Sequence, residues 1–156
     1  MGKPRSPQGR ARSVHERLKA EYEAVCELNH ESPFELLVAT ILSAQCTDVR
    51  VNKTTPAVFD RYPDSLALAH AHPGELEELV HATGFYKSKA RNLVKMANQL
   101  LEDHEGEVPT DLVDLVKLGG VGRKTANVIR SVAFGLPGLP VDTHVGRLAR
   151  RLGITE

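Results

Sequence analysis

A glycine-rich turn followed by two basic residues is the segment of this sequence with the clearest chemical potential. Residues 118–125 read Leu-Gly-Gly-Val-Gly-Arg-Lys-Thr. Glycines let a ligand approach the backbone N–H groups closely, and a helix that begins near Arg123 would add the positive end of its dipole. Such a turn suits a DNA phosphate, which it would bind without reading base sequence. The alternative is a plain turn between two helices, because glycine is common at helix ends.

The same turn does not fit one familiar class of phosphate site. A Walker A loop needs glycine immediately before its lysine, whereas Arg123 precedes Lys124 here. A helical pattern, rather than a strand, also leads into the turn. We therefore do not expect it to bind nucleoside triphosphates.

The elements that must position this turn are all predicted to be helices. A capping box at Ser32–Glu35, with proline at the first helical position, starts a helix whose following residues, 36–42, are all apolar except one threonine. This pattern is typical of the buried central helix of a bundle, and the capping box argues against a strand. Thr47 or Asp48 is expected to cap the next helix, which is broken near Pro56.

Apolar residues at helical spacing predict the remaining elements. We expect helices over about residues 12–28, 65–71, 73–83, 87–105, 111–116, 123–133 and 143–152, several of them closed by glycine. The predicted fold class is all-α, a helical bundle of eight or nine short helices in one domain over residues 12–156. Residues 1–11 are expected to form a basic flexible tail with weak nonspecific attraction to DNA.

Composition restricts the class of protein. The 156 residues are 41% hydrophobic and 26% charged, which is ordinary for a globular domain. No apolar run is long enough to span a membrane, and the basic N-terminus lacks the apolar core of a signal peptide. We therefore expect a cytoplasmic protein with no membrane partner, in which Cys26 and Cys46 are reduced thiols.

Charge is balanced overall but uneven along the chain. Residues 1–20 carry six basic and one acidic residue, residues 117–156 carry seven basic and two acidic residues, and the middle is acidic. Two basic ends permit a basic face for nucleic acid. Solvated helix faces explain the same pattern about as well.

Four motifs in a fixed order give the sequence a family resemblance. Residues 118–124 resemble the Leu-Pro-Gly-Val-Gly-x-Lys hairpin of the helix-hairpin-helix DNA repair glycosylases, with Gly119 in place of the proline. Residues 42–48, 83–90 and 141–144 match further motifs of that family. Together the motifs resemble its endonuclease III branch, over about residues 12–156. The missing proline is expected to loosen the entry to the turn.

The resemblance implies base excision repair: a DNA glycosylase for oxidised pyrimidines that is also an abasic-site lyase, cleaving 3′ of the lesion through a Schiff base and β-elimination. Lys124 matches the catalytic lysine. Near a helix N-terminus and beside Arg123 its charged form is expected to be disfavoured, which leaves more free amine to attack the sugar. Asp142 matches an aspartate that can stabilise a cationic sugar or assist deprotonation. A helix N-cap is the structural alternative for Asp142.

The resemblance also implies how the damaged nucleotide leaves the duplex. Gln45 matches a gap-filling glutamine, and Phe85 occupies the place of an apolar wedge. The DNA-binding residues that it implies are Gln45, Phe85, Gly120, Gly122, Arg123, His144 and Lys89, and Ser43 and Asp48 are expected to line the base pocket. Lys89 belongs to a basic cluster with Lys87, Arg91 and Lys95, for which a solvated helix face is an equal alternative.

One property of the branch has no counterpart in these residues. Its members usually hold a [4Fe–4S] cluster through four cysteines beyond this point, and Cys26 and Cys46 do not match that pattern. We therefore expect this chain to bind no metal and no cofactor. The first and last predicted helices are expected to lose a packing partner and to expose apolar side chains.

Other functions stay open at this point. A non-catalytic helix-hairpin-helix module, or an inactive fragment, would grip DNA without performing chemistry. An adenine-specific mismatch glycosylase is disfavoured, because that group lacks a lysine at the position of Lys124. The expected partner is duplex DNA that contains a damaged base or an abasic site, bound by a monomer.

Overall fold

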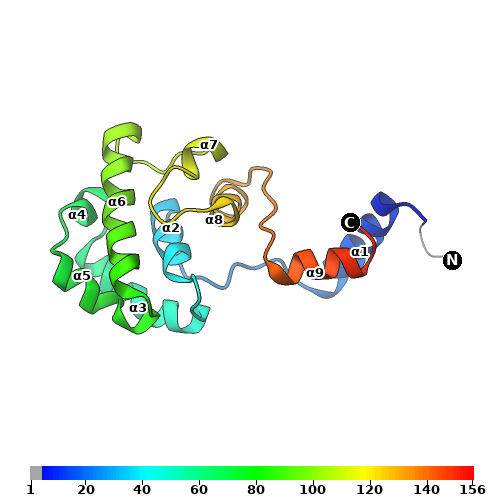
Figure 1. The fold of residues 1–156 in the computed structure, drawn as a ribbon, viewed down its shortest axis with the longest axis horizontal. Helices are drawn as coiled ribbons and strands as arrows, with labels where there is room; N and C mark the ends of the chain where they lie inside the picture. Colours follow the sequence, from blue (N-terminus) through cyan, green and yellow to red (C-terminus); the bar gives the residue numbers. More distant parts are fainter. Residues whose placement is uncertain (1–4) are drawn as a thin grey trace. The chain divides into compact units, whose positions relative to one another are not determined.

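The computed structural model describes residues 5–156, and its regular elements within that range are helical, which confirms the predicted all-α fold (Figure 1). A 3-10 turn, η1 (His81–Thr83), follows α5, and a π-helical turn, η2 (Ile129–Ala133), follows α8. The α-helices are α1 (Pro7–Glu21), α2 (Pro33–Leu42), α3 (Asp48–Arg61), α4 (Ser65–Ala69), α5 (Pro73–Val80), α6 (Tyr86–His104), α7 (Leu112–Leu115), α8 (Arg123–Val128) and α9 (Thr143–Arg151).

The chain divides into two compact units, where the sequence predicted one domain over residues 12–156. We call residues 27–140 the hairpin unit, and the chain up to Cys26 together with residues 141–156 the terminal unit. Helices α2–α8 of the hairpin unit share a buried apolar core, whereas α1 and α9 of the terminal unit bury none of their described residues.

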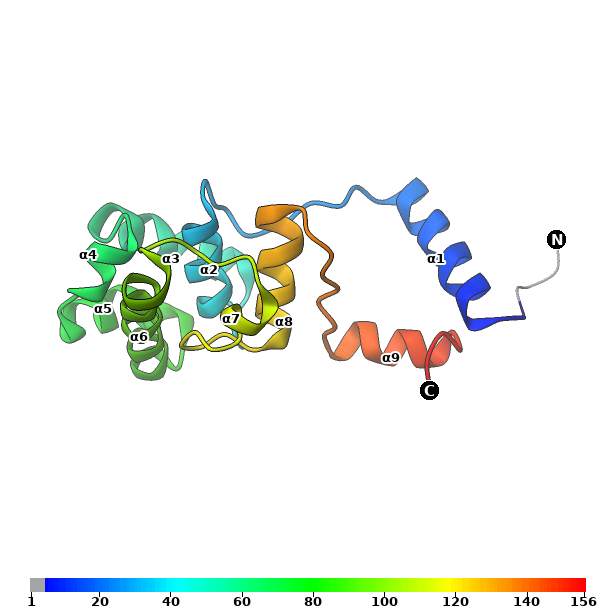
Figure 2. The ribbon, with the colours of Figure 1, turned by 90° about the horizontal axis from the view of Figure 1, so that it is seen from above.

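Helix α2 is the central element of the hairpin unit. The Ser32 hydroxyl accepts a hydrogen bond from the Glu35 amide at 3.2 Å, and the Glu35 carboxylate accepts one from the Glu31 amide at 2.7 Å. The helix buries Leu36, Leu37, Val38, Ala39, Ile41 and Leu42. It lies between α6 and α8 in both views (Figures 1 and 2), so the predicted central helix is confirmed.

Helix α3 continues through Pro56, so the break predicted there is wrong. A proline in a helix interior costs about 3 kcal/mol, because it removes one backbone hydrogen bond and crowds the preceding turn. Val51, Thr55 and Val58 are nevertheless buried on both sides of the proline. Packing of this face against the core outweighs the local cost.

Helix α1 begins and ends earlier than predicted. The Ser6 hydroxyl accepts a hydrogen bond from the Gly9 amide at 3.1 Å, and Pro7 takes the first helical position. Residues 7–11, predicted as part of a flexible tail, are helical, while residues 1–4 of that tail lie outside the described residues. Within the terminal unit, the Arg10 guanidinium donates to the carbonyl of Gly153, just beyond α9, at 2.9 Å.

Helices α7 and α8 form the predicted helix-hairpin-helix. Asp111 caps α7 by accepting a hydrogen bond from the Val113 amide at 2.9 Å, so the helix begins at Leu112, close to its predicted start at residue 111. Leu115, Leu118 and Val121 are buried between the two helices and the core. Burial of these three side chains holds the turn at 119–122 against the core.

Candidate functional site

Gly119 is held against α6 by its amide and by its lack of a side chain. The Gly119 amide donates to the Gln99 side-chain oxygen at 2.8 Å, and the Gln99 amide group donates to the Lys117 carbonyl at 2.9 Å. A Cβ at Gly119 would lie 2.7 Å from the backbone oxygen of Asn92. The expectation that Gly119 loosens the turn is therefore wrong, because the structure uses this glycine to fix the turn.

The outer side of the turn is open. Gly120 has a φ of +75°, and a Cβ there would lie 3.0 Å from the Asn92 side chain. Gly122 is the N-cap of α8 and makes no side-chain cap, and no atom lies within 4 Å of the place where its Cβ would stand. Arg123 and Lys124 are both exposed in the first turn of α8. An anion can therefore approach the first amides of α8 and two cations together.

Gln45 and Phe85 stand at the tips of two further loops of the hairpin unit. Both adopt a left-handed backbone, with φ values of 50° and 49°, which is uncommon for residues with side chains. Gln45 is exposed, and Phe85 is 68% exposed. Both side chains are available to an outside partner.

A hollow of about 480 Å³ separates these two loops, and we call it the loop hollow. Its lining residues are Gln45, Cys46, Thr47, Arg50, His81, Ala82, Thr83 and Gly84. Ser43 and Asp48, expected at a base pocket, do not line it. The half-buried Ser43 donates its hydroxyl to the Thr40 carbonyl at 2.8 Å, and Asp48 is exposed at the start of α3.

The structure does not place Lys89 where a DNA phosphate could reach it, so this predicted contact is wrong. Lys89 is 5% exposed, and its ammonium donates to the carbonyls of Leu42 at 2.8 Å and Thr83 at 2.7 Å. Burial lowers the pKa of Lys89, and the nearby Cys46 thiol opposes that shift. The other members of the cluster, Lys87, Arg91 and Lys95, are exposed on α6.

Asp142 and His144 belong to the terminal unit. The Asp142 carboxylate accepts a hydrogen bond from the Val145 amide at 2.7 Å and so caps α9, which confirms the structural role considered for it. His144 is exposed, and its Nδ1 lies 3.1 Å from the guanidinium of Arg147. Lys124 is in the hairpin unit, so the two predicted catalytic residues belong to different units.

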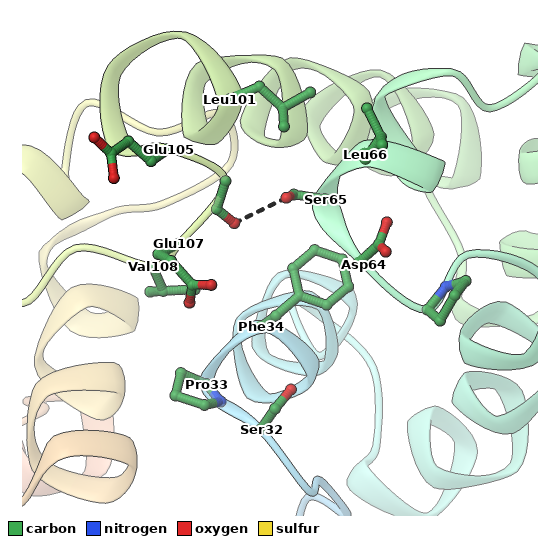
Figure 3. Close-up of a pocket in the computed structure, with 12 residues that line it drawn as sticks. Ser32, Pro33, Phe34, Asp64, Ser65, Leu66, Leu101, Glu105, Glu107 and Val108 are labelled. Carbon is green, nitrogen blue, oxygen red and sulfur yellow. Dashed lines mark hydrogen bonds between the residues drawn. The ribbon is translucent and has the colours of Figure 1, made fainter.

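A second hollow of the hairpin unit, about 460 Å³ in volume, is chemically unsuited to DNA. Asp64, Glu105 and Glu107 contribute carboxylates to its lining, and the Ser65 hydroxyl closes one edge by donating to the Gly106 carbonyl at 2.8 Å (Figure 3). The Phe34 ring lies near the middle of this hollow in the same view. Carboxylates repel phosphates, so we do not assign it to the site.

Residues 5–156 also bear on two other classes of site. No three His, Cys, Asp or Glu side chains in that range form a group that could hold a metal ion. None of the helices described there combines the length and the apolar character needed to cross a bilayer.

Two residues that shape the site could not be recognised from the sequence. Gln99 and Asn92 lie on α6 and look like ordinary polar residues of an exposed helix face. Only the packing of the hairpin on α6 brings Gln99 to the Gly119 amide and the Asn92 backbone against Gly119.

Three comparisons with known proteins agree. Residues 38–156 match the model of the HhH-GPD superfamily base excision DNA repair proteins. The chain is 52% identical to endonuclease III of Synechocystis sp., covering 100% of this chain and 72% of that protein. It is 51% identical to endonuclease III of Bacillus subtilis, covering 84% of this chain and 60% of that protein.

A solved structure extends the likeness to three dimensions. The fold matches that of a trapped endonuclease III–DNA covalent intermediate with a TM-score of 0.89 and 46% sequence identity. The match covers 97% of this chain and 71% of the other. The chain thus spans about 60 to 72% of the length of these relatives.

Proposed function

Because the chain belongs to the HhH-GPD superfamily of base excision DNA repair proteins, we propose that it is a DNA glycosylase and abasic-site lyase acting on oxidised pyrimidines in duplex DNA. The observation that carries the proposal is the open N-terminus of α8, where Gly122, Arg123 and Lys124 are exposed together. The similarity to an endonuclease III trapped covalently on DNA supports it.

The proposed reaction begins at Lys124. Its free amine attacks C1′ of the damaged nucleotide, and the base leaves with the electrons of the glycosidic bond and takes up a proton. The sugar ring opens to a Schiff base between the lysine nitrogen and C1′. A proton then leaves C2′, the 3′ phosphate departs, and the strand is cut 3′ of the lesion. Water hydrolyses the remaining imine and restores the lysine.

Asp142 takes the electrostatic part in this proposal. Its carboxylate stabilises positive charge on the sugar or accepts a proton from the lysine. The hydrogen bond from the Val145 amide supports the assignment, because it holds the carboxylate in one orientation at the start of α9.

The remaining predicted residues bind the DNA. Gly120, Gly122, Arg123 and His144 contact the sugar–phosphate backbone in this proposal. Extruding the damaged nucleotide leaves a gap, which Gln45 and Phe85 fill from the two loops beside the loop hollow. Ser43 and Asp48 keep their proposed place at the extruded base, and Lys89 drops out of the DNA-binding set because it is buried.

No step of this reaction passes through a metal cluster. A [4Fe–4S] cluster takes four cysteine ligands, and the chain holds two cysteines. Cys26 belongs to the terminal unit and Cys46 to the hairpin unit. These residues do not fit the cluster, and we propose that the 156 residues act without a cofactor of their own.

We propose that the chain binds duplex DNA containing a damaged base or an abasic site as a monomer, in the cytoplasm where that DNA lies. The competing function is a module that grips the DNA backbone without chemistry. The exposed lysine in the first turn of α8 favours the enzyme, because phosphate binding by backbone amides does not require it.

Borohydride trapping tests the proposed function directly. The chain is incubated with a duplex containing one abasic site, or one thymine glycol, and the Schiff base is then reduced. We expect a covalent adduct with both duplexes, loss of that adduct in Lys124→Ala, and its retention in Lys53→Ala, which removes an exposed lysine of α3.

Two other trapping results would change the proposed function. An adduct with the abasic duplex alone would mean lyase activity without base excision. DNA binding with no adduct on either duplex would establish the non-catalytic module instead.

A further inference from the structure

The burial of the Lys89 ammonium has no part in the proposed reaction. It leaves the first turn of α6 and turns inward, where it is 5% exposed. Its ammonium donates to the Leu42 carbonyl at 2.8 Å and to the Thr83 carbonyl at 2.7 Å. Leu42 is the last residue of α2, and Thr83 is the last residue of η1. One side chain therefore joins the ends of two elements to the start of a third.

The joined segments are those that carry the two exposed loop tips. Gln45 lies three residues after Leu42, and Phe85 lies two residues after Thr83. The Lys89 backbone amide also donates to the Phe85 carbonyl, at 3.0 Å. Lys89 thus contacts the residues that lead into both loops, and the Phe85 carbonyl itself.

Both tips need external support. Gln45 and Phe85 hold left-handed backbone conformations, which non-glycine residues keep only where their surroundings determine them. Arg50 braces the second loop from α3 by donating to the Ala82 carbonyl, at a longer 3.4 Å. The Lys89 ammonium adds two shorter bonds, one to the residue that ends α2 before the first loop and one to the residue that ends η1 before the second.

The chemistry of this link favours an ammonium over an apolar side chain. Burying a charge is costly, and an apolar residue of similar size would fill the space at lower cost. Carbonyls at helix ends lack intrahelical partners and carry partial negative charge, so a cation with several N–H donors can satisfy two at once. What the charged residue adds is a fixed geometry between the carbonyls.

We propose that Lys89 is a positioning residue that holds the Gln45 and Phe85 loops at a fixed separation, so that both tips enter a duplex together when a nucleotide is extruded. This inference rests on the proposed function. Lys89 itself touches neither the DNA nor the reacting sugar. A uniform loss of stability is therefore not the result that the inference predicts.

Fluorescence tests the inference without catalysis. The chain has no tryptophan, so Phe85→Trp places a single tryptophan at one tip, and excitation at 295 nm avoids its three tyrosines. The probe is a duplex with a non-reactive tetrahydrofuran abasic analogue, on whose bases the indole stacks. We expect quenching with Lys89 in place and with Lys53→Met, which replaces an exposed lysine of α3 outside the proposed site. We expect Lys89→Met to need about tenfold more duplex or to show no quenching.

An activity ratio gives a second readout. A single-stranded abasic oligonucleotide needs no extrusion and no gap filling, whereas thymine glycol in a duplex needs both. We expect Lys89→Met to keep the single-strand adduct within about twofold and to lose about tenfold or more in duplex base excision. Equal losses on the two substrates, or unchanged quenching, would overturn the inference.

Two controls keep the outcome unambiguous. If the Phe85→Trp chain with Lys89 intact shows no quenching, the proposed wedge itself fails, and with it that part of the proposed function. If Lys89→Met does not fold, Lys89→Arg takes its place, because a planar guanidinium keeps the charge but cannot hold both carbonyls at the same spacing. A folded Lys89→Arg variant with parental quenching and a parental activity ratio would refute the inference.

Discussion

At the scale of a single residue, Asp142 has two roles, as a helix cap and as a charged group of the proposed reaction. Substitutions can distinguish the two roles. Its carboxylate caps α9 through the Val145 amide, and its charge is assigned to the reaction. Asparagine caps a helix about as well as aspartate, whereas alanine loses about 1 kcal/mol of helix stability. We expect Asp142→Asn to keep the stability of α9 and Asp142→Ala to lower it by that amount.

Activity should follow the charge instead of the cap. Both Asp142 variants are expected to slow adduct formation by about 10²-fold or more, because both remove the carboxylate. Single-turnover trapping measures the rate, and amide exchange of α9 measures the stability. Parental activity in Asp142→Asn would leave Asp142 with the capping role alone.

Burial of Lys89 should make stability depend on alkaline pH. Burial lowers its pKa in the folded state below the ordinary value of 10.5. Between the two pKa values the unfolded chain binds more protons than the folded chain, so the free energy of unfolding rises with pH across that window. Urea unfolding at increasing pH should show this rise in the parent and in Lys87→Met, and a smaller rise in Lys89→Met. Parallel profiles for all three would contradict it.

At the scale of elements, the hairpin depends on how closely it packs on α6. The family resemblance places proline where this chain has Gly119, and the structure explains why the exchange would not be neutral here. A proline would remove the N–H that donates to Gln99 and would bring a Cβ within 2.7 Å of the Asn92 carbonyl.

Substitutions at Gly119 test that packing. We expect Gly119→Pro to lower the free energy of unfolding by about 2–4 kcal/mol, through overpacking and the loss of a hydrogen bond. Gly119→Ala keeps the amide and should lose about 1–3 kcal/mol from overpacking alone. Gly122→Ala is the control, because the space beside it is open. Urea unfolding measures the free energy of unfolding of all three variants. A Gly119→Pro chain as stable as the parent would show that the packing of Gly119 on α6 is not required.

The observed helix boundaries show which local sequence signals predicted them correctly. Local signals placed α2 and α5 correctly, because Ser32, Pro33 and Pro73 act on the residues next to them. Pro56 misled the prediction for α3, because core packing on both sides outweighed a local cost. A cap at Ser6 moved the start of α1 to Pro7, ahead of the residues whose apolar spacing had suggested a helix.

At the scale of the whole molecule, the terminal unit should be less stable than the hairpin unit. Helices α1 and α9 bury none of their described residues, and several of their apolar side chains are exposed, as the sequence predicted. The large apolar side chains of the terminal unit that are more than 40% exposed are Leu18 in α1, Leu148 in α9, and Tyr22, Val25, Val141 and Leu152 outside these helices.

Amide exchange measures this difference. Local stability follows buried apolar contacts, so we expect the amides of α1 and α9 to exchange well before those of α2 and α6. The buried Leu36 and Leu93 mark the well-protected helices, at 0% exposure each. Equal protection of all four helices would mean that the terminal unit is held by interactions other than apolar burial.

The sequence by itself determined the helical class, the hairpin and the family to which the chain belongs. Caps, glycine turns and apolar spacing act over a few residues, and the four motifs are readable as a linear pattern. These properties need no knowledge of which distant segments meet.

Only the tertiary structure decided the fate of Lys89 and Gly119. Lys89 sits in a run of basic residues on α6, and its burial depends on carbonyls 6 and 47 residues away in the chain. Gly119 is required by Gln99, 20 residues earlier, and by the Asn92 backbone. Whether a charged side chain faces solvent or a glycine can be replaced depends on which helix faces pack together, and contacts between distant segments set that packing.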